Sequence, residues 1–498
     1  MRPLFHKPCF AVLAALLLGA LTTLTFAPFN LWWLGPIVCA PLYGLLRGTR
    51  IRRGMLTGFF YGVGLFGSGA SWVYVSINVF GNANAVEATL LTLVFVLGLA
   101  LFYLIAAAFY RALSPKVSCM EPLTFAAAWT LAEVFRGWFL TGFPWLFLGS
   151  AHLTSPLASY APIGGVYLIS FLVALSGALL WHLVIGRRLR VIVPLALIWI
   201  VGALLPTQWL TPDAKSISVS LIQGNLPESE KWSFQGEENA VNTYLDLTRQ
   251  HGSQSDLVIW PEAALPMTLQ DAMPVFASAQ SSMKVGSSLI SGIITTQGKN
   301  FFNSAVAFDQ HTQGGMTTTL YRKYRLVPFG EYVPLEGLLR PMLGFFNLPT
   351  SHMSQGAAHQ PPLTANGLKV GMSICYEVVY PDLVREQAKH ANMLVTISND
   401  SWFGHSIGPV QQMQMAQMRA LENNRYLMQD TSDGVTAVAA PDGRIIASMP
   451  RFVSGALNTV VHPVYGETLF TRTGSWPIIV ISLILVAIGA VKSRRQQR

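Results

Sequence analysis

Cys375 lies in a stretch whose residue types could support nucleophilic catalysis. The run 368–372 before it is apolar and predicts a strand, and Asp382 to His390 after it predicts a helix. A cysteine at a strand-to-helix turn, with the carboxylate of Glu377 two residues further on, is a suitable position for a nucleophile. Buried cysteines are common and mostly inert, so this pattern alone is not specific.

The distribution of the four cysteines sets Cys375 apart. Cys9 and Cys39 lie inside predicted membrane spans, and Cys119 lies at the edge of another. Cys375 is the one cysteine between residues 211 and 470, so it has no disulfide partner in that block. In an oxidising compartment structural cysteines normally pair. An unpaired cysteine there is either buried and inert or reactive, and other residues must decide between the two.

A nucleophilic cysteine needs a base or a nearby cation, because a free thiol is mostly protonated at neutral pH. The run 256–260 predicts a strand, and Glu262 follows its end behind Pro261. Ligands of α/β sheets bind at strand ends, so Glu262 is placed to act as a general base. Lys323, in the Arg- and Lys-containing run 321–334, could hold an oxyanion or lower the pKa of the thiol.

Each of these residues also has a structural interpretation. Glu262 could be a helix N-cap, Lys323 a surface charge and Glu331 a solvated loop residue. A Ser/His/Asp triad is not supported, since the chain has no serine elbow. No metal or other cofactor is expected, because three histidines of the polar block lack ligand spacing: His352, His359 and His405.

The composition indicates a membrane protein. The chain is 52% hydrophobic and 11% charged, whereas about 25% of the residues of an average globular protein are charged. The net charge of +9 raises the possibility of nucleic-acid binding. Within residues 211–470, however, acidic side chains outnumber basic ones, and the basic excess flanks the hydrophobic segments. Nucleic acid is therefore not an expected partner.

Apolar segments of roughly spanning length predict a polytopic helical bundle of about eight spans. Seven precede Pro212 and one follows Gly474. The domains expected are a seven-span membrane domain at 1–210, a polar block at 211–470, and a last transmembrane helix with a basic tail at 471–498. The expected spans are Pro8 to Phe26, Leu31 to Leu46, Met55 to Ile77, Ala88 to Tyr110, Pro122 to Leu140, Ile163 to Ile185, Val191 to Trp209 and Trp476 to Val491.

The loop charges predict the orientation of these spans. Lys and Arg occur in every second connection and in the C-terminal tail, and the alternate loops 27–30, 78–87 and 141–162 have none. Cytoplasmic loops are the ones enriched in Lys and Arg. Both termini are thus expected in the cytoplasm and the polar block outside. In the fifth span, Glu133 and Arg136 could line a substrate path or neutralise each other as an ion pair.

The polar block alternates β-rich runs with helical patterns, which favours a layered α/β domain. The expected strands are Ser216 to Ile222, Asp256 to Trp260, Ser287 to Ile294, Asn303 to Phe308, Leu368 to Ile374, Met393 to Ser398 and Val435 to Ala440. The expected helices are Glu237 to His251, Gln270 to Ser281, Asp382 to His390 and Pro409 to Met428.

Three of these segments resemble the Glu-Lys-Cys signature of the nitrilase superfamily: 260–262, 321–323 and 375–377. Further runs are similar to its membrane-bound branch, the apolipoprotein N-acyltransferases: 223–225, 231–232, 326–334, 398–404, 418–422 and 141–145. The resemblance implies an α-β-β-α sandwich mounted on a membrane bundle. It also implies location in the bacterial inner membrane, with the catalytic domain on the periplasmic side.

The resemblance further implies a reaction. A phospholipid would donate a fatty acyl chain to form a thioester on Cys375, and the acyl group would pass to the α-amino group of an apolipoprotein's N-terminal diacylglyceryl-cysteine. Glu262 would be the base and Lys323 the oxyanion donor, whereas Glu331 and Glu377 would orient Lys323 and the cysteine turn. Tyr376 would shape the pocket.

Four aromatic residues are expected to line the acyl-chain path or a mobile lid, with ordinary interfacial packing as the alternative: Trp145, Trp232, Trp402 and Phe403. One segment departs from the family pattern. Where members often have Arg-x-Thr-Asn-x-Gly, residues 429–434 read Gln-Asp-Thr-Ser-Asp-Gly. Two rival functions stay open at this point, namely a membrane-tethered amidase that transfers the acyl group to water and a transporter with a binding domain.

Overall fold

The computed structural model describes residues 8–81, 83–114, 120–310, 317–332 and 352–495. Cys119 therefore lies outside the described residues, as does the end of the 321–334 run. The chain divides into two compact units. The first comprises Met1–Asn78, Asn84–Thr207 and Thr473–Arg498, and the second comprises Val79–Ala83 and Gln208–Arg472.

The first unit is helical, and an apolar helix overlaps each expected span. Short 3₁₀ turns connect several of them, including Pro156–Tyr160 before α7 and Leu189–Val191 before α8. The helices are α1 (Pro8–Thr23), α2 (Leu34–Leu46), α3 (Ile51–Gly69), α4 (Val73–Val75), α5 (Ala85–Leu113), α6 (Glu121–Trp138), α7 (Ala161–Val184), α8 (Ile192–Leu204) and α15 (Trp476–Arg495).

Within the described residues, two helices are long and apolar enough to cross a membrane, Ala85–Leu113 and Pro156–Val184. A third is added if Ile51–Gly69 and Val73–Phe80, which are bent by 60°, form one span. Other apolar helices are shorter, such as the 13-residue α2. At 1.5 Å per residue such a helix covers about 20 Å of a hydrocarbon core of about 30 Å. The number of eight spans is therefore not confirmed.

Glu133 and Arg136 on α6 both bind the backbone of the loop that follows this helix. A Glu133 carboxylate oxygen accepts hydrogen bonds from the Leu148 amide at 2.8 Å and the Trp129 indole at 3.0 Å. The Arg136 guanidinium donates to the Phe143 carbonyl at 2.8 Å and also to the carbonyl of Trp145. The two buried charges thus fix the course of the loop, a role that neither sequence interpretation included.

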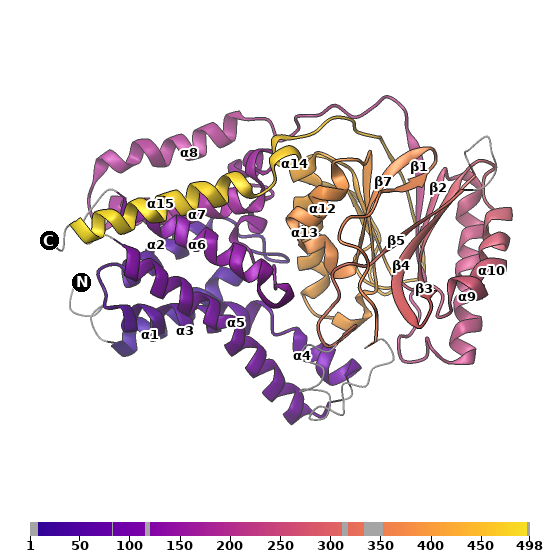
Figure 1. The fold of residues 1–498 in the computed structure, drawn as a ribbon, viewed down its shortest axis with the longest axis horizontal. Coiled ribbons are helices and arrows are strands. Elements are labelled where there is room, and N and C mark those ends of the chain that lie inside the picture. The colour runs from indigo at the N-terminus through magenta and orange to yellow at the C-terminus, as the bar shows by residue number, and fades with distance from the viewer. Residues whose placement is uncertain (1–7, 82, 115–119, 311–316, 333–351, 496–498) are drawn as a thin grey trace. The chain divides into compact units, whose positions relative to one another are not determined.

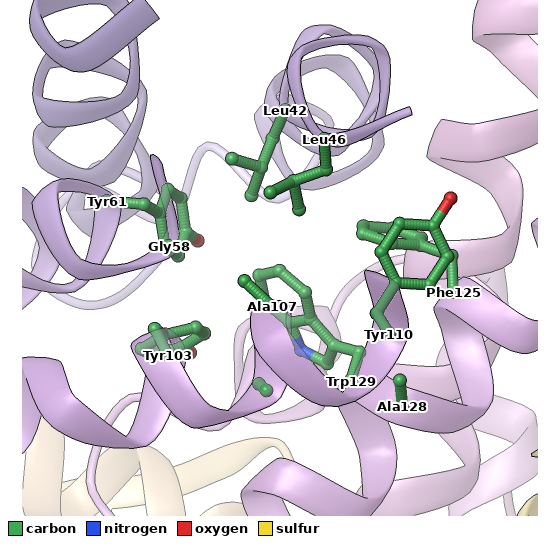
Figure 2. A pocket seen from close by; sticks show the side chains of 11 residues that line it. Leu42, Leu46, Gly58, Tyr61, Tyr103, Ala107, Tyr110, Phe125, Ala128 and Trp129 are labelled. Carbon is green, nitrogen blue, oxygen red and sulfur yellow. The ribbon is translucent and has the colours of Figure 1, made fainter. Parts of the chain in front are cut away.

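An apolar cavity lies in the first unit beside a cluster of aromatic rings (Figure 2). Tyr61, Tyr103 and Trp129 line it and contact one another edge to face, with ring centroids 5.0 to 5.6 Å apart. Such T-shaped pairs are a favoured aromatic geometry. The rings therefore pack α3, α5 and α6 against one another.

The second unit contains two six-stranded sheets (Figure 1). The first has the order β12-β1-β2-β3-β4-β5 and the second the order β11-β10-β9-β8-β7-β6. Their strands are β1 (Ile217–Gln223), β2 (Leu257–Trp260), β3 (Ser288–Gln297), β4 (Asn300–Asp309), β5 (Thr317–Arg322), β6 (Leu363–Ala365), β7 (Leu368–Ile374), β8 (Met393–Ser398), β9 (Leu427–Thr431), β10 (Ala437–Ala439), β11 (Ile445–Ser448) and β12 (Gly455–Val461).

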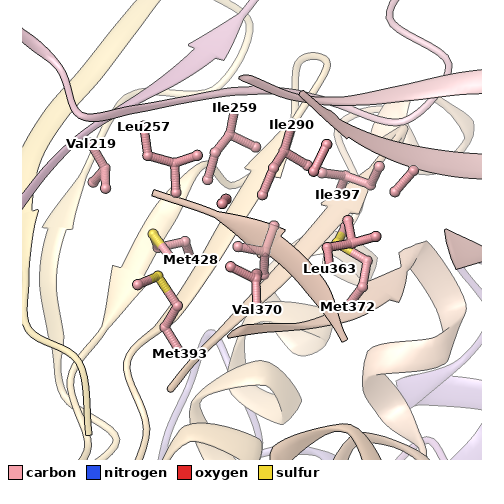
Figure 3. Packing of buried hydrophobic residues seen from close by; sticks show 14 of the residues in the cluster. Val219, Leu257, Ile259, Ile290, Leu363, Val370, Met372, Met393, Ile397 and Met428 are labelled. Carbon is pink, nitrogen blue, oxygen red and sulfur yellow. The ribbon is translucent and has the colours of Figure 1, made fainter. Parts of the chain in front are cut away.

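The sheets pack face to face over one core (Figure 3). It joins Val219, Ile259 and Ile290 of the first sheet to residues of the second, such as Val370 and Met428. Helices α9 (Phe234–His251) and α10 (Leu269–Ser281) cover the outer face of the first sheet, and α12 (Pro381–Ala388) and α13 (Gly408–Asn423) cover the second (Figure 1). The unit is therefore an α-β-β-α sandwich, as the resemblance implies.

The predicted end of the last helix was wrong. The pattern predicted a helix from Pro409 to Met428, whereas α13 ends at Asn423 and residues 427–431 form β9. Asn424 adopts a left-handed conformation with φ of 46°, which stops the helix. Its side chain also accepts a hydrogen bond from the Trp209 amide, so a contact distant in sequence stabilises this turn.

Candidate active site

Cys375 lies at a sharp turn between β7 and a 3₁₀ helix that spans Cys375–Val379. Its backbone is left-handed, with φ of +52°, a conformation that non-glycine residues adopt rarely and that costs free energy. The residue is partly exposed, although β7 before it and residues 377–379 after it are largely buried. The strained turn therefore presents the thiol at the end of a buried strand.

Glu262 lies two residues beyond the end of β2, where the chain passes very close to β3. The Gly292 amide donates to the Pro261 carbonyl at 3.2 Å, and the Ala264 amide donates to the Gly292 carbonyl at 3.1 Å. A Cβ atom at position 292 would lie only 2.5 Å from the Pro261 oxygen. Glycine is thus required at position 292 to seat the Glu262 turn.

The Glu262 carboxylate is buried and accepts hydrogen bonds at both oxygens. Oε1 accepts from the Asn303 side-chain amide at 2.6 Å and lies 3.1 Å from the Lys323 ammonium, and Oε2 accepts from the Asn399 backbone amide at 2.8 Å. Asn399 directly follows β8 of the second sheet. The carboxylate therefore bridges the ends of the two sheets.

Lys323 directly follows β5 and is 1% exposed. Its ammonium lies 3.0 Å from the Glu331 carboxylate, in addition to its contact with Glu262. The second oxygen of Glu331 accepts from the Val327 amide at 2.8 Å, which closes the loop that carries it. Lys323 is therefore not a surface charge and Glu331 is not a solvated loop residue, contrary to the structural interpretations of these two residues.

Asn303 on β4 belongs to this cluster and was missed by the sequence reasoning. Its side-chain amide donates both to Glu262 at 2.6 Å and to Glu331 at 2.8 Å, and its carbonyl accepts from the Lys323 amide at 2.8 Å. The Asn303 side chain thus orients two carboxylates, and its backbone carbonyl holds the backbone of Lys323. The available signal was an amide side chain at the start of the predicted strand 303–308.

The charges of the cluster stabilise one another. Burial alone would raise the pKa of Glu262, but the Lys323 charge and the hydrogen bonds from Asn303 and Asn399 hold that pKa below its usual value. Burial would lower the pKa of Lys323, yet Glu262 and Glu331 raise it well above its usual value. The pKa of the Cys375 thiol is raised, first by burial and then by the Glu262 charge. The resting site is therefore a neutral thiol beside a carboxylate–ammonium pair.

Glu377 connects the cysteine turn to the lysine loop. The fully buried carboxylate accepts from the Ile374 amide at 2.8 Å, and from the amides of Tyr324 and Arg325 at 2.7 and 3.0 Å. Burial raises its pKa to about 7, against the opposing effect of these amides. The residue before Cys375 and the residues after Lys323 are thereby held by the same side chain.

The aromatic candidates lie in different environments. Trp145 is buried in the first unit and stacks on Phe143 at 5.8 Å. In the second unit Trp232 is 43% exposed, and Trp402 is half-buried with its ring 5.5 Å from that of Phe80. Phe403 and Tyr376 are also half-buried. The structure thus brings Glu262, Lys323 and Glu331 into direct contact, whereas Trp145 lies in the first unit and the other four aromatic residues are at least partly exposed in the second.

Comparison with known proteins agrees with this architecture. The carbon–nitrogen hydrolase family model matches residues 218–464, so the second unit is a carbon–nitrogen hydrolase domain. The model of the apolipoprotein N-acyltransferase N-terminal domain matches residues 18–179. Over the full length, the chain is 40% identical to the apolipoprotein N-acyltransferase of Pseudomonas syringae pv. tomato, covering 97% of both chains. It is 38% identical to that of Vibrio vulnificus, covering 99% of both. The chain belongs to the apolipoprotein N-acyltransferase family.

Among solved structures, the chain is similar to a carbon–nitrogen hydrolase superfamily protein from Xanthomonas campestris. The identity is 16%, the TM-score is 0.37, and the match covers 53% of this chain and 97% of that protein.

Proposed function

We propose that the enzyme transfers a fatty acyl chain from a phospholipid, through a thioester on Cys375, to the α-amino group of the N-terminal diacylglyceryl-cysteine of an apolipoprotein. The observation that carries the proposal is the cluster at the ends of the two sheets. There the charges of Glu262 and Lys323 both act on the Cys375 thiol, and the carboxylate and ammonium are 3.1 Å apart. Membership of the acyltransferase family supports the choice of substrates.

The first half-reaction forms the thioester. Glu262 accepts the thiol proton as the Cys375 sulfur attacks the ester carbonyl, and Lys323 stabilises the negative charge that develops on the carbonyl oxygen. When the ester C–O bond breaks, the proton passes from Glu262 to the departing lysophospholipid oxygen. The low pKa of Glu262 supplies an ionised base, and the neutral thiol keeps its proton until the ester carbonyl is in place.

The second half-reaction uses the same groups in reverse. The α-amino group of the apolipoprotein attacks the thioester carbonyl, Glu262 accepts the amine proton, and Lys323 again holds the oxyanion. The C–S bond then breaks, and the proton on Glu262 returns to the Cys375 sulfur. Because the two substrates react in turn through one covalent intermediate, the kinetics are ping-pong.

The supporting residues have structural roles in this scheme. Glu331 holds Lys323 from its other side and Glu377 fixes the cysteine turn relative to the lysine loop. Tyr376 shapes the acyl pocket, with Trp232, Trp402 and Phe403 along the path of the acyl chain. The burial of Trp145 favours the packing alternative for that residue.

The proposed topology has eight spans, with 1–210 as a seven-span domain, 211–470 as the periplasmic domain and 471–498 as the last span with a cytoplasmic tail. Both termini lie in the cytoplasm, and the phospholipid and diacylglyceryl substrates reach the enzyme from the bilayer of the bacterial inner membrane. The restriction of Lys and Arg to alternate loops supports this arrangement.

Two introduced cysteines test the orientation. Val285→Cys in the second unit and Leu189→Cys in an Arg-rich connection replace side chains that are 96% and 72% exposed. A membrane-impermeant maleimide should label the first in cells with a permeabilised outer membrane, and the second only after the inner membrane is disrupted. The reverse pattern would overturn the topology.

Intact-protein mass spectrometry after incubation with phospholipid tests the reaction. The wild-type enzyme should gain one fatty acyl mass on Cys375, and a diacylglyceryl-cysteine peptide with a free amine should discharge it. Cys375→Ala should form no adduct, whereas the matched variant Cys9→Ala should behave as wild type. Rapid discharge by water without the peptide would support the amidase alternative, and the absence of any adduct under active conditions would refute the proposal.

A further inference from the structure

Ser398 is placed next to Cys375 by the pairing of their strands. Strands β7 and β8 are parallel, and their last paired residues are Ile374 and Ile397. Cys375 and Ser398 are the next residue on each strand. Ser398 is fully buried, and its hydroxyl acts on the Cys375 thiol as a hydrogen-bonding group that lowers the pKa of that thiol. The nucleophile therefore has a hydroxyl partner that the Glu262–Lys323 cluster does not use.

The other partner of Ser398 is the carboxyl group of Asp400. The Ser398 hydroxyl and Asp400 Oδ1 are 2.6 Å apart, and Asp400 is 1% exposed. A Cβ atom at position 434 would lie 2.1 Å from Asp400 Oδ2, so Gly434 leaves room for the carboxyl group. The three side chains thus form a chain of hydrogen bonds from Asp400 through Ser398 to the sulfur.

The position of the proton decides what this chain does, because a serine hydroxyl can donate only one hydrogen bond. If Asp400 is ionised, it accepts the Ser398 proton, and Ser398 can only accept a bond from the neutral thiol. If Asp400 is protonated, it donates to Ser398, whose own proton is then free for the sulfur. Only the second arrangement stabilises a Cys375 thiolate.

We propose that Asp400 and Ser398 are positioning residues that hold a hydrogen-bond donor against the anionic Cys375 sulfur while Asp400 is protonated. The inference rests on the proposed role of Cys375. No net proton transfer along the chain is needed, because Glu262 still accepts and returns the thiol proton. The donor stabilises negative charge on the sulfur in both half-reactions. It acts as the thiolate develops during attack on the ester, and again as the thiolate leaves the thioester.

The surroundings of Asp400 favour its protonated form. Burial raises its pKa to about 7, the hydrogen bond from Ser398 opposes the rise, and the neighbouring Asp433 adds to it. Arg451 acts in the opposite direction but lies further down the order of effects. Asp433 lies in the 429–434 segment, at a position where the family pattern has no fixed residue, and its charge helps to keep Asp400 protonated.

Other charged side chains also act on the Asp400–Ser398–Cys375 group or on its neighbour Asp433. Glu262 raises the pKa of the Cys375 thiol and Lys323 lowers it, and the charge of Asp400 itself raises it when Asp400 is ionised. Glu228 and Lys231 face Asp433, again with opposite signs. Within the described part of the chain, Asp400 is thus the carboxyl group directly hydrogen-bonded to Ser398, and its own ionisation should switch the direction of that bond.

The test is the pH dependence of thiol alkylation of the full-length enzyme in detergent, measured by mass spectrometry with iodoacetamide. Ser398→Ala removes a hydrogen bond to a charged sulfur and should slow Cys375 alkylation about 10-fold to 100-fold at neutral pH. Asp400→Asn carries a permanent donor. It should match wild type near pH 6 and react several-fold faster near pH 8.5, where wild-type Asp400 is ionised.

A double variant and a matched control separate the chain of bonds from general damage. In the Ser398→Ala background, Asp400→Asn should lose its effect through the hydroxyl and keep only the lesser effect of removing the Asp400 charge, which acts on the thiol directly. Thr396→Ala removes another buried hydroxyl from β8, one whose oxygen has no described partner, and should leave the profile unchanged. Thermal unfolding checks that each variant is folded.

An unchanged alkylation profile in Ser398→Ala would overturn the inference, as would an Asp400→Asn effect that is equally large with and without Ser398. Acylation by phospholipid is measured on the same wild-type sample. If no acyl adduct forms there, the proposed function fails. If the adduct forms and the alkylation profiles do not differ, only the Asp400–Ser398 inference fails.

Discussion

Replacing Lys323 by methionine tests the central electrostatic argument, because methionine keeps most of the volume and removes the charge. In the wild-type site the ammonium lies 3.1 Å from Glu262 and 3.0 Å from Glu331 and is 1% exposed. The variant leaves two buried carboxylates that share the Asn303 amide. Their repulsion and burial should bring a proton into the site, so the pKa of Glu262 should rise above its usual value.

Two magnitudes follow. Loss of an oxyanion donor lowers the rate about 10²–10³-fold, and a protonated Glu262 cannot act as the base, so acyl-adduct formation should fall by at least about 10²-fold. Breaking a buried ion pair by removing one partner costs about 3–5 kcal/mol. Uptake of a proton offsets part of that cost where the pH is low enough.

The stability of Lys323→Met should therefore fall as pH rises, whereas the contribution of Glu262 to wild-type stability falls as pH is lowered. In wild type the pKa of Glu262 is lowered, so its stabilisation is present above the unfolded-state pKa and is lost as pH falls through the folded-state pKa. In Lys323→Met the raised pKa gives stability at low pH that is lost as pH rises. Thermal unfolding near pH 5 and near pH 8 measures the difference.

Lys284→Met is the matched control, since Lys284 is half-exposed and its ammonium lies 2.6 Å from the Asp256 carboxylate at the surface. A surface pair contributes about 0–1 kcal/mol, and acylation should be unaffected. The reasoning is refuted if Lys323→Met keeps the acylation rate within about tenfold of wild type. It is also refuted if the stability lost is equal at both pH values.

Two further changes probe the framework of the site. Gly292→Ala would place a Cβ atom 2.5 Å from the Glu262 Cα, so we expect destabilisation of about 1–3 kcal/mol with a larger proportional loss of acylation. Gly98→Ala, whose Cβ meets open space, should show neither effect. Thermal unfolding and adduct mass measure the two quantities. Asn303→Ala removes a hydrogen bond that lowers the pKa of Glu262, so the acid limb of the acylation rate should move up by about one pH unit; an unmoved limb would contradict the role assigned to Asn303.

The sequence predicted the parts of the site that depend on local patterns. Strand β7 was predicted with its observed bounds, and β2 ends at Trp260 as expected, because apolar runs that stop at a turn or a proline are strong local signals. The positions of Glu262 and Cys375 just beyond strand ends follow directly from these two strands.

What the sequence did not predict depends on contacts between distant segments. Asn303 on β4 binds both Glu262, which follows β2, and Glu331, which follows β5. No local sequence pattern indicates that these three segments lie together. Strand β5, which positions Lys323, was not predicted although its threonine run at 317–319 has β propensity. The number of spans also stays a prediction, because apolar composition alone does not fix how long a helix becomes before its chain turns.

Because Glu262 bridges the two sheets, the site is complete only when both sheets are packed together. Glu262, the proposed base, and Lys323 follow strands of the first sheet, whereas Cys375, the proposed nucleophile, and the Asn399 amide follow strands of the second. A sandwich whose sheets have separated would therefore lack the contact between the two halves of the site. The proposed acyl carrier is thereby kept apart from its base until the whole domain has folded, since the strained cysteine turn and Glu262 come together only in the closed sandwich.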